Sequence, residues 1–494
     1  MVASQGINLL TQLLLPALFI RRYGVPVYGE WLVLSAAVSY LSTLNFGITT
    51  YVSNQLTMLY QRKEMESYHR LQASSLRLLL GILGCAVLLL PLVFFVPVAR
   101  WLHLHVSQHE TSLVILFLGA SVMVSILQGY FSTMFMVISR MHRGSSWSNC
   151  QALLRTTVLL VLIGLHRSFV VLAFSMMTVG LVILLPCILD FCRIAPDLKP
   201  SLRPYHWPTA KAMLKPSGMF ALLFFQNVLA FQMPVLIIQQ ILGGSAVVVF
   251  SISRTVFSMV RQIISAVGGS IGPEITRTFG ARDWPALLRI YHASEKVIFT
   301  MVVVGNLGVL VISPVLLRAW LHKPGLFETT AYGLMALTSA ALSMKDHKFG
   351  FQFWTNEHHE LAVVSFFSYL SMCIVGYPLT RWLGVNGFVL AWLTAEVSQI
   401  FLIYRLNRKL FAAHGKIVPY PIYKVFALLI VGTPFCTWLA GRGSNWPSLE
   451  LLAAGALSMA ALLAACYQLF GLSQIRAELA GRIGALRGVG ARPA

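Results

Sequence analysis

Charged residues are scarce in this sequence. Asp, Glu, Lys and Arg together make up 11% of its 494 residues, whereas 57% of the residues are hydrophobic, and an ordinary soluble domain has roughly 25% charged residues. Runs such as 78–98, 112–138 and 297–317 contain no charged residue, and each is near or above the ~20 residues that span a bilayer as a helix. The composition therefore excludes a soluble globular protein and predicts an all-α polytopic membrane protein.

Motifs for catalysis and metal binding are also missing. The seven cysteines lie mostly inside apolar segments, without a CxxC pair or a Cys/His cluster, so neither a disulfide framework nor a metal site is indicated. The sequence has no Walker phosphate-binding loop and no HExxH zinc motif. We therefore expect a protein that is not an enzyme and that has no cofactor.

About fourteen apolar segments are candidates for transmembrane helices. The first begins almost at Met1 and lacks the basic region and small-residue cleavage site of a secretory signal peptide, so we expect it to be a retained helix. An even number of spans places both termini on the same side of the membrane. The segments are centred near residues 12, 42, 88, 125, 158, 179, 229, 257, 307, 340, 371, 397, 430 and 459.

The 37 Lys and Arg residues lie mainly between the predicted spans. If the N-terminus is cytoplasmic, basic clusters fall in the inner loops 61–77, 193–215, 277–296 and 405–424, and the outer loops carry few basic residues. Because Lys and Arg concentrate on the cytoplasmic side of membrane proteins, both termini are predicted to be cytoplasmic. The net charge of +21 is then explained by topology and contact with lipid headgroups, and no nucleic-acid partner is expected.

The chain resembles itself at a constant offset of 219 residues. Each copy contains six spans, so both copies enter the membrane in the same direction, as in the parallel repeats of secondary transporters. We expect an N-terminal six-helix lobe at 1–192, a basic cytoplasmic linker at 193–215, a C-terminal six-helix lobe at 216–410, and two extra transmembrane helices with a basic cytoplasmic tail at 411–494. The repeat is carried by Gly24 and Gly243, Lys63 and Arg282, Glu64 and Asp283, and Trp101-Leu102-His103 and Trp320-Leu321-His322.

The eighth predicted span has a polar face. Its members, at spacings of 3, 4, 3 and 4, are Ser251, Arg254, Ser258, Arg261 and Ser265. An arginine at membrane depth normally faces a water-filled cavity or a partner, and two guanidinium groups about 10 Å apart suit a diphosphate. Alternatively, the serines are small packing residues and Arg261 extends to the cytoplasmic end.

Other polar residues inside spans complete the list of candidates. Arg155, Asn227, Gln226 and Asn8 are candidates for the same substrate-binding cavity, although each by itself also fits an interhelical hydrogen bond.

Acidic residues are rarer within the spans. Glu396 is a candidate for coupling to H⁺ or Na⁺, or it neutralises an arginine. Asp346, a second candidate for coupling, and Glu30 are expected at the interfaces.

Three segments resemble a known family. FIRRYGVPVYGEWL at 19–32, with LNFGI at 44–48, and YPLTRWLGVNGFVLA at 377–391 resemble the polysaccharide transporter family, the Wzx-type lipid-linked oligosaccharide flippases of the multidrug/oligosaccharidyl-lipid/polysaccharide exporter superfamily. Arg254 matches a basic residue that recurs in the eighth span of flippases of this superfamily. Glu30 departs from the usual pattern.

The resemblance implies two lobes around a cationic cavity and a bacterial inner-membrane location. The implied cargo is an undecaprenyl-diphosphate-linked oligosaccharide for exopolysaccharide, capsule or O-antigen (lipopolysaccharide) synthesis. Membrane lipids, a polysaccharide polymerase and chain-length proteins are the implied partners.

Three other functions stay open at this stage. A lipid II flippase or a multidrug exporter of the same superfamily would have the same two-lobe fold. A membrane polysaccharide polymerase or acyltransferase would also be polytopic and basic, but such enzymes usually carry a large outer loop, and the outer loops here are short. The internal repeat also argues against an enzyme of this kind.

Overall fold

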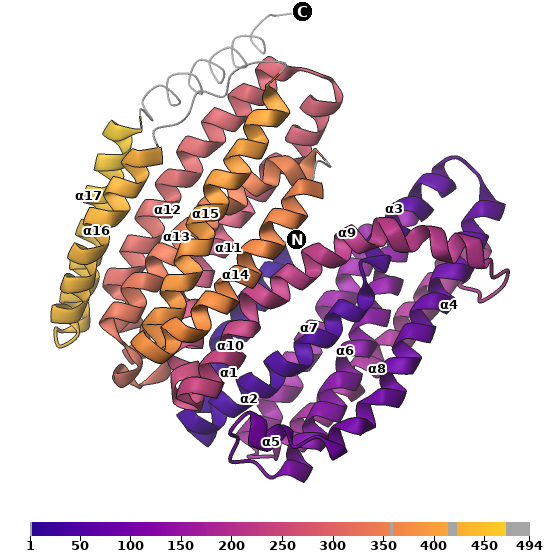
Figure 1. The fold of residues 1–494 in the computed structure, drawn as a ribbon, viewed down its shortest axis with the longest axis horizontal. Coiled ribbons are helices and arrows are strands. Elements are labelled where there is room, and N and C mark those ends of the chain that lie inside the picture. The colour runs from indigo at the N-terminus through magenta and orange to yellow at the C-terminus, as the bar shows by residue number, and fades with distance from the viewer. Residues whose placement is uncertain (1, 356–358, 413–421, 471–494) are drawn as a thin grey trace, which may run out of the picture. The chain divides into compact units, whose positions relative to one another are not determined.

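A computed structural model describes residues 2–355, 359–412 and 422–470 (Figure 1). Within these residues all regular structure is helical, which confirms the predicted fold class. The α-helices, and the 3₁₀ helices labelled η, are α1 (Val2–Tyr23), α2 (Val25–Ser39), η1 (Tyr40–Asn45), α3 (Ile48–Gln61), α4 (Met65–Leu89), η2 (Leu90–Phe95), α5 (Val98–Trp101), α6 (Gln108–Val137), α7 (Met141–Gly164), α8 (Phe169–Ile194), η3 (Pro196–Leu198), α9 (Trp207–Phe231), α10 (Met233–Leu242), α11 (Gly244–Gly280), α12 (Trp284–Leu321), η4 (Pro324–Leu326), α13 (Thr329–Trp354), α14 (His359–Leu383), α15 (Val385–Phe411), α16 (Ile422–Gly443) and α17 (Ser448–Leu469).

Eleven helical segments of the described residues are long and apolar enough to cross a membrane. The other three predicted spans, centred near residues 12, 158 and 340, coincide with the long helices α1, α7 and α13, which are not among the eleven. In α13 the run Lys345-Asp346-His347-Lys348 lowers the apolar character. All fourteen predicted spans therefore correspond to helices, although three of them are less apolar than the rest.

The described part of the chain divides into two compact units. Unit 1 consists of residues 1–251 and 365–388, and unit 2 of residues 252–364 and 389–494. The helices α11, α14 and α15 contribute residues to both units. The two units are defined by which residues pack together, and each combines two separate ranges of the chain. The lobes expected from the repeat are instead continuous ranges, so their boundaries stay a prediction.

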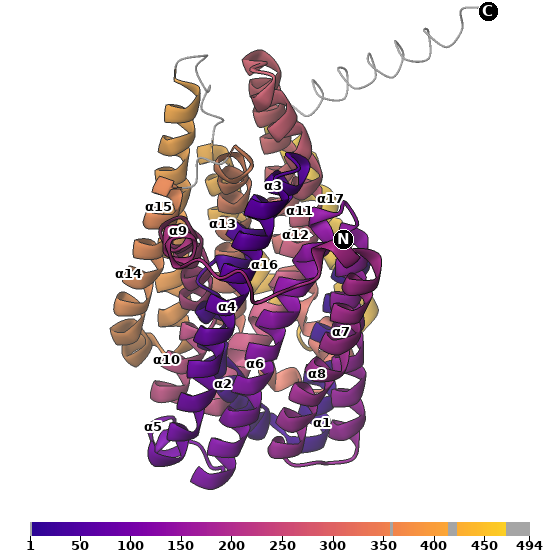
Figure 2. The same ribbon diagram turned by 90° about the vertical axis from the view of Figure 1, so that its right-hand side faces the viewer.

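In unit 1, α6 lies beside α7 and α8, and α1 packs against α7 (Figures 1 and 2). A core of apolar and aromatic side chains, among them Tyr68, Tyr130, Phe135 and Phe191, fills the space between α3, α4, α6 and α8. The segment after α8 contacts α4: the side-chain amide of Gln72 donates a hydrogen bond to the backbone carbonyl of Leu198 at 3.1 Å. Part of the predicted linker is thus anchored to unit 1.

In unit 2, α12 packs against α13, α16 and α17, and α16 and α17 lie side by side (Figure 1). Two glycines of unit 2 meet side chains closely: a Cβ at Gly333 would lie 2.7 Å from the hydroxyl of Thr437, and a Cβ at Gly455 would overlap Ile312. The two helices that lie outside the sequence repeat are therefore packed closely onto the helices of unit 2.

The backbone repeats at the same offset as the sequence. Gly24 and Gly243 have φ of 85° and 83°, a conformation that glycine adopts without strain. The other aligned pairs are non-glycine residues in the left-handed region: Lys63 and Arg282 have φ of 61° and 58°, and His103 and His322 have φ of 50° and 56°. Matching turns at three places 219 residues apart confirm the internal repeat.

Candidate functional site

The polar face predicted on the eighth span lies on α11. Arg254 and Arg261 are both partly exposed, and seven residues of helix separate them by about 10 Å along the axis. The hydroxyl of Ser258 donates to the carbonyl of Thr255 at 2.8 Å, a bond within its own helix. The role of Ser258 in packing or in binding stays a prediction, and the two guanidinium groups provide the positive charge of this face.

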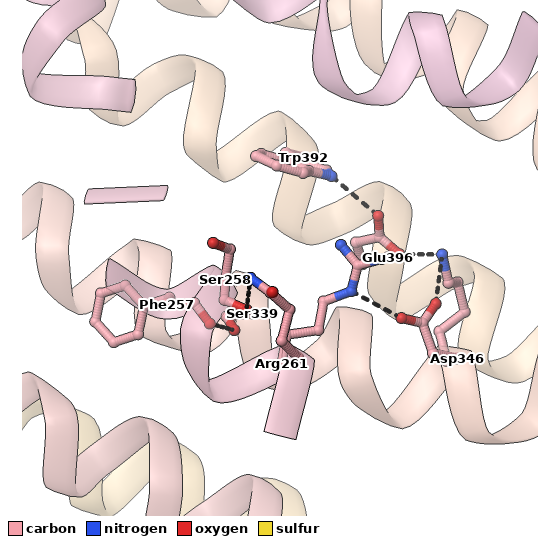
Figure 3. Close-up of polar contacts among 9 residues, drawn as sticks. Phe257, Ser258, Arg261, Ser339, Asp346, Trp392 and Glu396 are labelled. Atoms are coloured by element: carbon pink, nitrogen blue, oxygen red, sulfur yellow. Dashed lines mark hydrogen bonds and ion pairs between the residues drawn. The ribbon is translucent and has the colours of Figure 1, made fainter. Parts of the chain in front are cut away.

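Arg261 begins a chain of alternating charges in unit 2 (Figure 3). Its Nε donates to Oδ2 of Asp346 at 2.9 Å, and Nζ of Lys345 lies 3.4 Å from the other oxygen of Asp346. The same Nζ lies 3.4 Å from Oε2 of Glu396, whose Oε1 accepts a hydrogen bond of 2.9 Å from the indole of Trp392. We call these four ionic groups, Arg261, Asp346, Lys345 and Glu396, the ion chain.

The ion chain runs from a half-buried end to a fully buried end. The side chains of Arg261 and Asp346 are each 31% exposed, whereas those of Lys345 and Glu396 are 8% and 0% exposed. A buried charge is costly unless it is paired, and here two cations alternate with two anions. The ion chain therefore compensates its own charge and links α11, α13 and α15.

The ion chain contains three residues for which the sequence suggested roles, namely Arg261, Asp346 and Glu396. Arg261 is bound to Asp346 through its Nε, and Asp346, expected at an interface, is half-buried. A lysine, Lys345, lies beside Glu396. The roles of these residues in binding and in coupling stay predictions.

A second buried ionic cluster lies close to the ion chain along α13. Nζ of Lys348 lies 2.5 Å from Oε1 of Glu295 on α12 and 3.3 Å from the hydroxyl of Tyr291. The side chains of Lys348 and Glu295 are 1% and 2% exposed. On α15, the amide of Asn407 donates to the backbone carbonyl of Lys348 at 3.1 Å, and it accepts a bond of 2.8 Å from Gln352. The cluster joins α12, α13 and α15.

Sequence reasoning missed this second cluster. Glu295 falls within the predicted inner loop 277–296, and Lys348 lies two residues from Asp346, which the sequence places at an interface. A signal was present in the spacing, because Lys345 and Lys348 are three residues apart and therefore lie on one face of a helix. A lysine pair at helical spacing within one span indicates a buried face that needs carboxylates from neighbouring helices.

The remaining candidates lie in unit 1. Arg155 is partly exposed, with its Nη2 at 3.7 Å from the sulfur of Met176. The amide of Asn227 donates to the carbonyl of Leu223, four residues earlier in its own helix, at 2.9 Å. Gln226 is buried and Asn8 is exposed. The described contacts thus join Arg261, Asp346 and Glu396 in one network, while these four residues belong to the other unit.

The charges of the ion chain are absent from the first copy of the repeat. At the offset of 219, Arg261, Lys345, Asp346 and Glu396 align with Ser42, Ile126, Leu127 and Met177. The two copies therefore share their turns but differ in the polarity of their interiors. Any chemistry of the ion chain is restricted to the second copy.

Comparisons with known proteins identify the fold. No protein-family profile matches the sequence, and no curated protein matches it. Among solved structures, an inward-facing multidrug resistance MATE family transporter of the MOP superfamily has a TM-score of 0.69 at 12% identity, over 83% of this chain and 95% of that one. The lipid II flippase MurJ, in an inward closed conformation, has a TM-score of 0.67 at 12% identity, over 94% of this chain and 98% of that one.

A second MATE structure, in the bent conformation, has a TM-score of 0.59 at 14% identity, over 87% of this chain and 94% of that one. The chain therefore has the fold that MATE transporters and MurJ share. MurJ covers a larger share of this chain than either MATE structure does. The structural similarity to MurJ therefore extends over more of the sequence.

Proposed function

We propose that this protein is a flippase that moves undecaprenyl-diphosphate-linked oligosaccharides from the cytoplasmic to the periplasmic leaflet of a bacterial inner membrane. The observation that carries the proposal is the fold similarity to the lipid II flippase MurJ, which covers almost the whole of both chains. In this proposal both termini are cytoplasmic, and the product supplies exopolysaccharide, capsule or O-antigen synthesis. The polymerase and chain-length proteins that use the product are the expected partners.

The charges on α11 support a diphosphate cargo. A sugar headgroup is too polar to cross hydrocarbon unaided, so a flippase has to provide a polar path while the lipid tail stays in the bilayer. Arg254 and Arg261 are partly exposed, and a guanidinium group binds phosphate oxygens in a bidentate manner. Asp346 holds Arg261 through its Nε at 2.9 Å, which fixes the direction of this guanidinium group. We therefore assign diphosphate binding to Arg254 and Arg261.

The ion chain supports coupling to protons rather than to sodium. The ammonium group of Lys345 already lies 3.4 Å from a carboxylate oxygen of Asp346 and 3.4 Å from one of Glu396. A sodium ion between these two carboxylates would have to displace the ammonium group of Lys345, which is part of the protein chain. Transfer of a proton to Glu396 would instead release Lys345 without placing a metal cation beside it, and buried carboxylates serve as proton relays in transporters. Alternating access would then follow from the change in charge.

A multidrug exporter is the second candidate, and a specific observation favours it. The similarity to the MATE transporter has a TM-score of 0.69, slightly above the 0.67 for MurJ. The two arginines on α11 oppose it when the drug is cationic, because like charges repel. The two candidates therefore differ in the charge of the cargo.

The test is to delete the gene and to measure the amount and sidedness of the lipid-diphosphate-linked oligosaccharide. The deletion is complemented with wild type, with Arg254→Ala and with Arg62→Ala, a control that removes an exposed arginine outside the predicted spans. We expect inner-leaflet accumulation that wild type and Arg62→Ala relieve and that Arg254→Ala, expressed at the same level, does not.

Unchanged lipid intermediates in the deletion strain would reject the flippase. Rhodamine 6G efflux is measured in the same strains. Efflux that disappears with the gene, while lipid intermediates stay constant, would establish the multidrug exporter instead.

A further inference from the structure

Unit 1 contains a cavity of about 430 Å³ whose lining does not include the α11 arginines. Its walls come from the junction of α1 and α2, from the segment before and at the start of α6, and from the start of α8. All three segments are outer ones in the predicted topology. The residues that give the cavity its chemistry are Tyr23, Glu30, His105, Glu110, Ser168 and Phe169.

Glu30 is a buried carboxylate in the wall of this cavity. The residue is 4% exposed, and its Oε1 accepts a hydrogen bond of 2.9 Å from the backbone amide of His105 and lies 2.7 Å from Nδ1 of the same residue. The hydrogen bonds described for Glu30 all involve Oε1, and Glu30 is part of the cavity lining. One oxygen thus holds the loop of His105, while the carboxylate as a whole contributes negative charge to the cavity wall.

The direction of Glu30 follows from the packing of its neighbour. Gly29 contacts Gly244 so closely that a Cβ at Gly29 would overlap the backbone of Gly244. Successive helical residues differ by about 100° around the axis, so α2 presents Glu30 to a different side, where the His105 loop lies. A tight glycine contact therefore orients the buried acid.

The other walls combine a second acid with aromatic rings. Glu110, in the first turn of α6, is partly exposed. The rings of Tyr23 and Phe169 lie 6.3 Å apart, and the hydroxyl of Tyr23 donates to the carbonyl of Arg167 at 2.6 Å, which fixes its ring. The lining contains no Lys or Arg side chain. Two carboxylates beside aromatic faces attract a cation with an apolar body.

A metal ion does not fit this cavity. No three His, Cys, Asp or Glu side chains in the described ranges are grouped so that they could hold a metal ion. The volume lies in the range of small-molecule sites, and it suits one ring. An organic cation is therefore the ligand class that fits both the charge and the size.

We propose that this cavity, defined by Glu30, Glu110, Tyr23 and Phe169, binds a protonated amine carried on a single ring. Two sources share this chemistry, namely an aminated sugar of a glycan and a small aromatic amine. The site is additional to the arginines on α11, and amine binding does not depend on which cargo those arginines bind.

The test measures binding to the purified full-length protein by isothermal titration at pH 7. The probes are two matched pairs, glucosamine with glucose and benzylamine with benzyl alcohol, which differ in charge more than in shape. We expect the amine of at least one pair to bind at least about tenfold more tightly than its neutral partner. The pair that shows the preference identifies the source.

Three variants complete the test. Glu30→Gln is expected to remove the preference for the amine, whereas the control Glu450→Gln, at an exposed acid in unit 2, is expected to keep it. Ser168→Trp changes an exposed residue of the lining and should fill the cavity, so it tests the site independently if Glu30→Gln does not fold. Equal binding within both pairs, or a preference that survives Glu30→Gln or Ser168→Trp in folded protein, would overturn the proposal. Neither result would alter the lipid-intermediate test of the flippase.

Discussion

Lys345 lies between two carboxylates of unit 2, with its Nζ 3.4 Å from Oδ1 of Asp346 and 3.4 Å from Oε2 of Glu396. The lysine therefore joins a half-buried ion pair, that of Arg261 and Asp346, to a fully buried carboxylate. A change of charge at Glu396 has a direct route to Arg261 through adjacent side chains.

Replacing Glu396 with Gln should destabilise the protein. The substitution keeps the size of the side chain but removes the negative charge next to a lysine that is 8% exposed, and loss of one partner of a buried ion pair costs about 3 kcal/mol. The measurement is the free energy of unfolding in mixed detergent micelles. The double variant Lys345→Gln/Glu396→Gln is the control and should recover most of the loss. A double variant that is less stable than both single variants would contradict the pairing.

Replacing Lys348 with Met should be at least as costly. It leaves Glu295, with a side chain 2% exposed, without its cation, and the expected loss is about 3–5 kcal/mol. Because a buried pair is often replaceable by apolar residues of similar volume, Lys348→Met/Glu295→Leu should be close to wild type in unfolding free energy. If Lys348→Met alone is as stable as wild type, Glu295 does not depend on this lysine.

The charge at position 254 should determine flipping. In proteoliposomes with a fluorescent polyprenyl-diphosphate sugar, Arg254→Ala should slow flipping at least about tenfold, since a charged hydrogen bond contributes about 1.5–3 kcal/mol. Arg254→Lys keeps the charge but not the planar, bidentate donor, so an intermediate rate is expected. Dithionite quenching of lipid exposed on the outer surface gives the rate. Equal rates for all three proteins would remove Arg254 from the proposed site.

The glycine contact between α2 and α11 should not tolerate a methyl group. A Cβ at Gly29 would overlap the backbone of Gly244, and overpacking typically costs about 1–3 kcal/mol. Gly29→Ala should therefore lower the melting temperature, whereas Gly81→Ala, where a Cβ meets nothing within 4 Å, should leave it equal or higher. The reverse order would show that α2 shifts freely at this point.

Much of the fold was predictable because the bilayer restricts the options. A backbone in hydrocarbon must satisfy its own hydrogen bonds, so long apolar runs become helices. The repeat was also visible, since identical residues such as Gly24 and Gly243 mark turns with the same φ. The charged α13 was still recognised as a span, because its neighbours in sequence are apolar.

The partners of the polar residues were less predictable. Helical periodicity placed Arg254 and Arg261 on one face of their helix. It does not predict which helix packs against that face, because the packing depends on the rotation and position of each helix. Asp346 therefore emerged as the partner of Arg261 only in the structure. The contact of Glu30 with His105 joins residues 75 apart in sequence, and it depends on the conformation of a loop that no periodic pattern describes.

The low apolar character of α13 bears on how the protein is made. A lysine or aspartate is costly during insertion by the translocon, roughly 2.5–3.5 kcal/mol at the centre of a helix, and α13 carries Lys345, Asp346 and Lys348 in its C-terminal half. The carboxylate that neutralises Lys348 is Glu295 on α12, which is synthesised first. We therefore expect α12 and α13 to leave the translocon as a hairpin, so that a chain truncated after α13 integrates only if Glu295 is present.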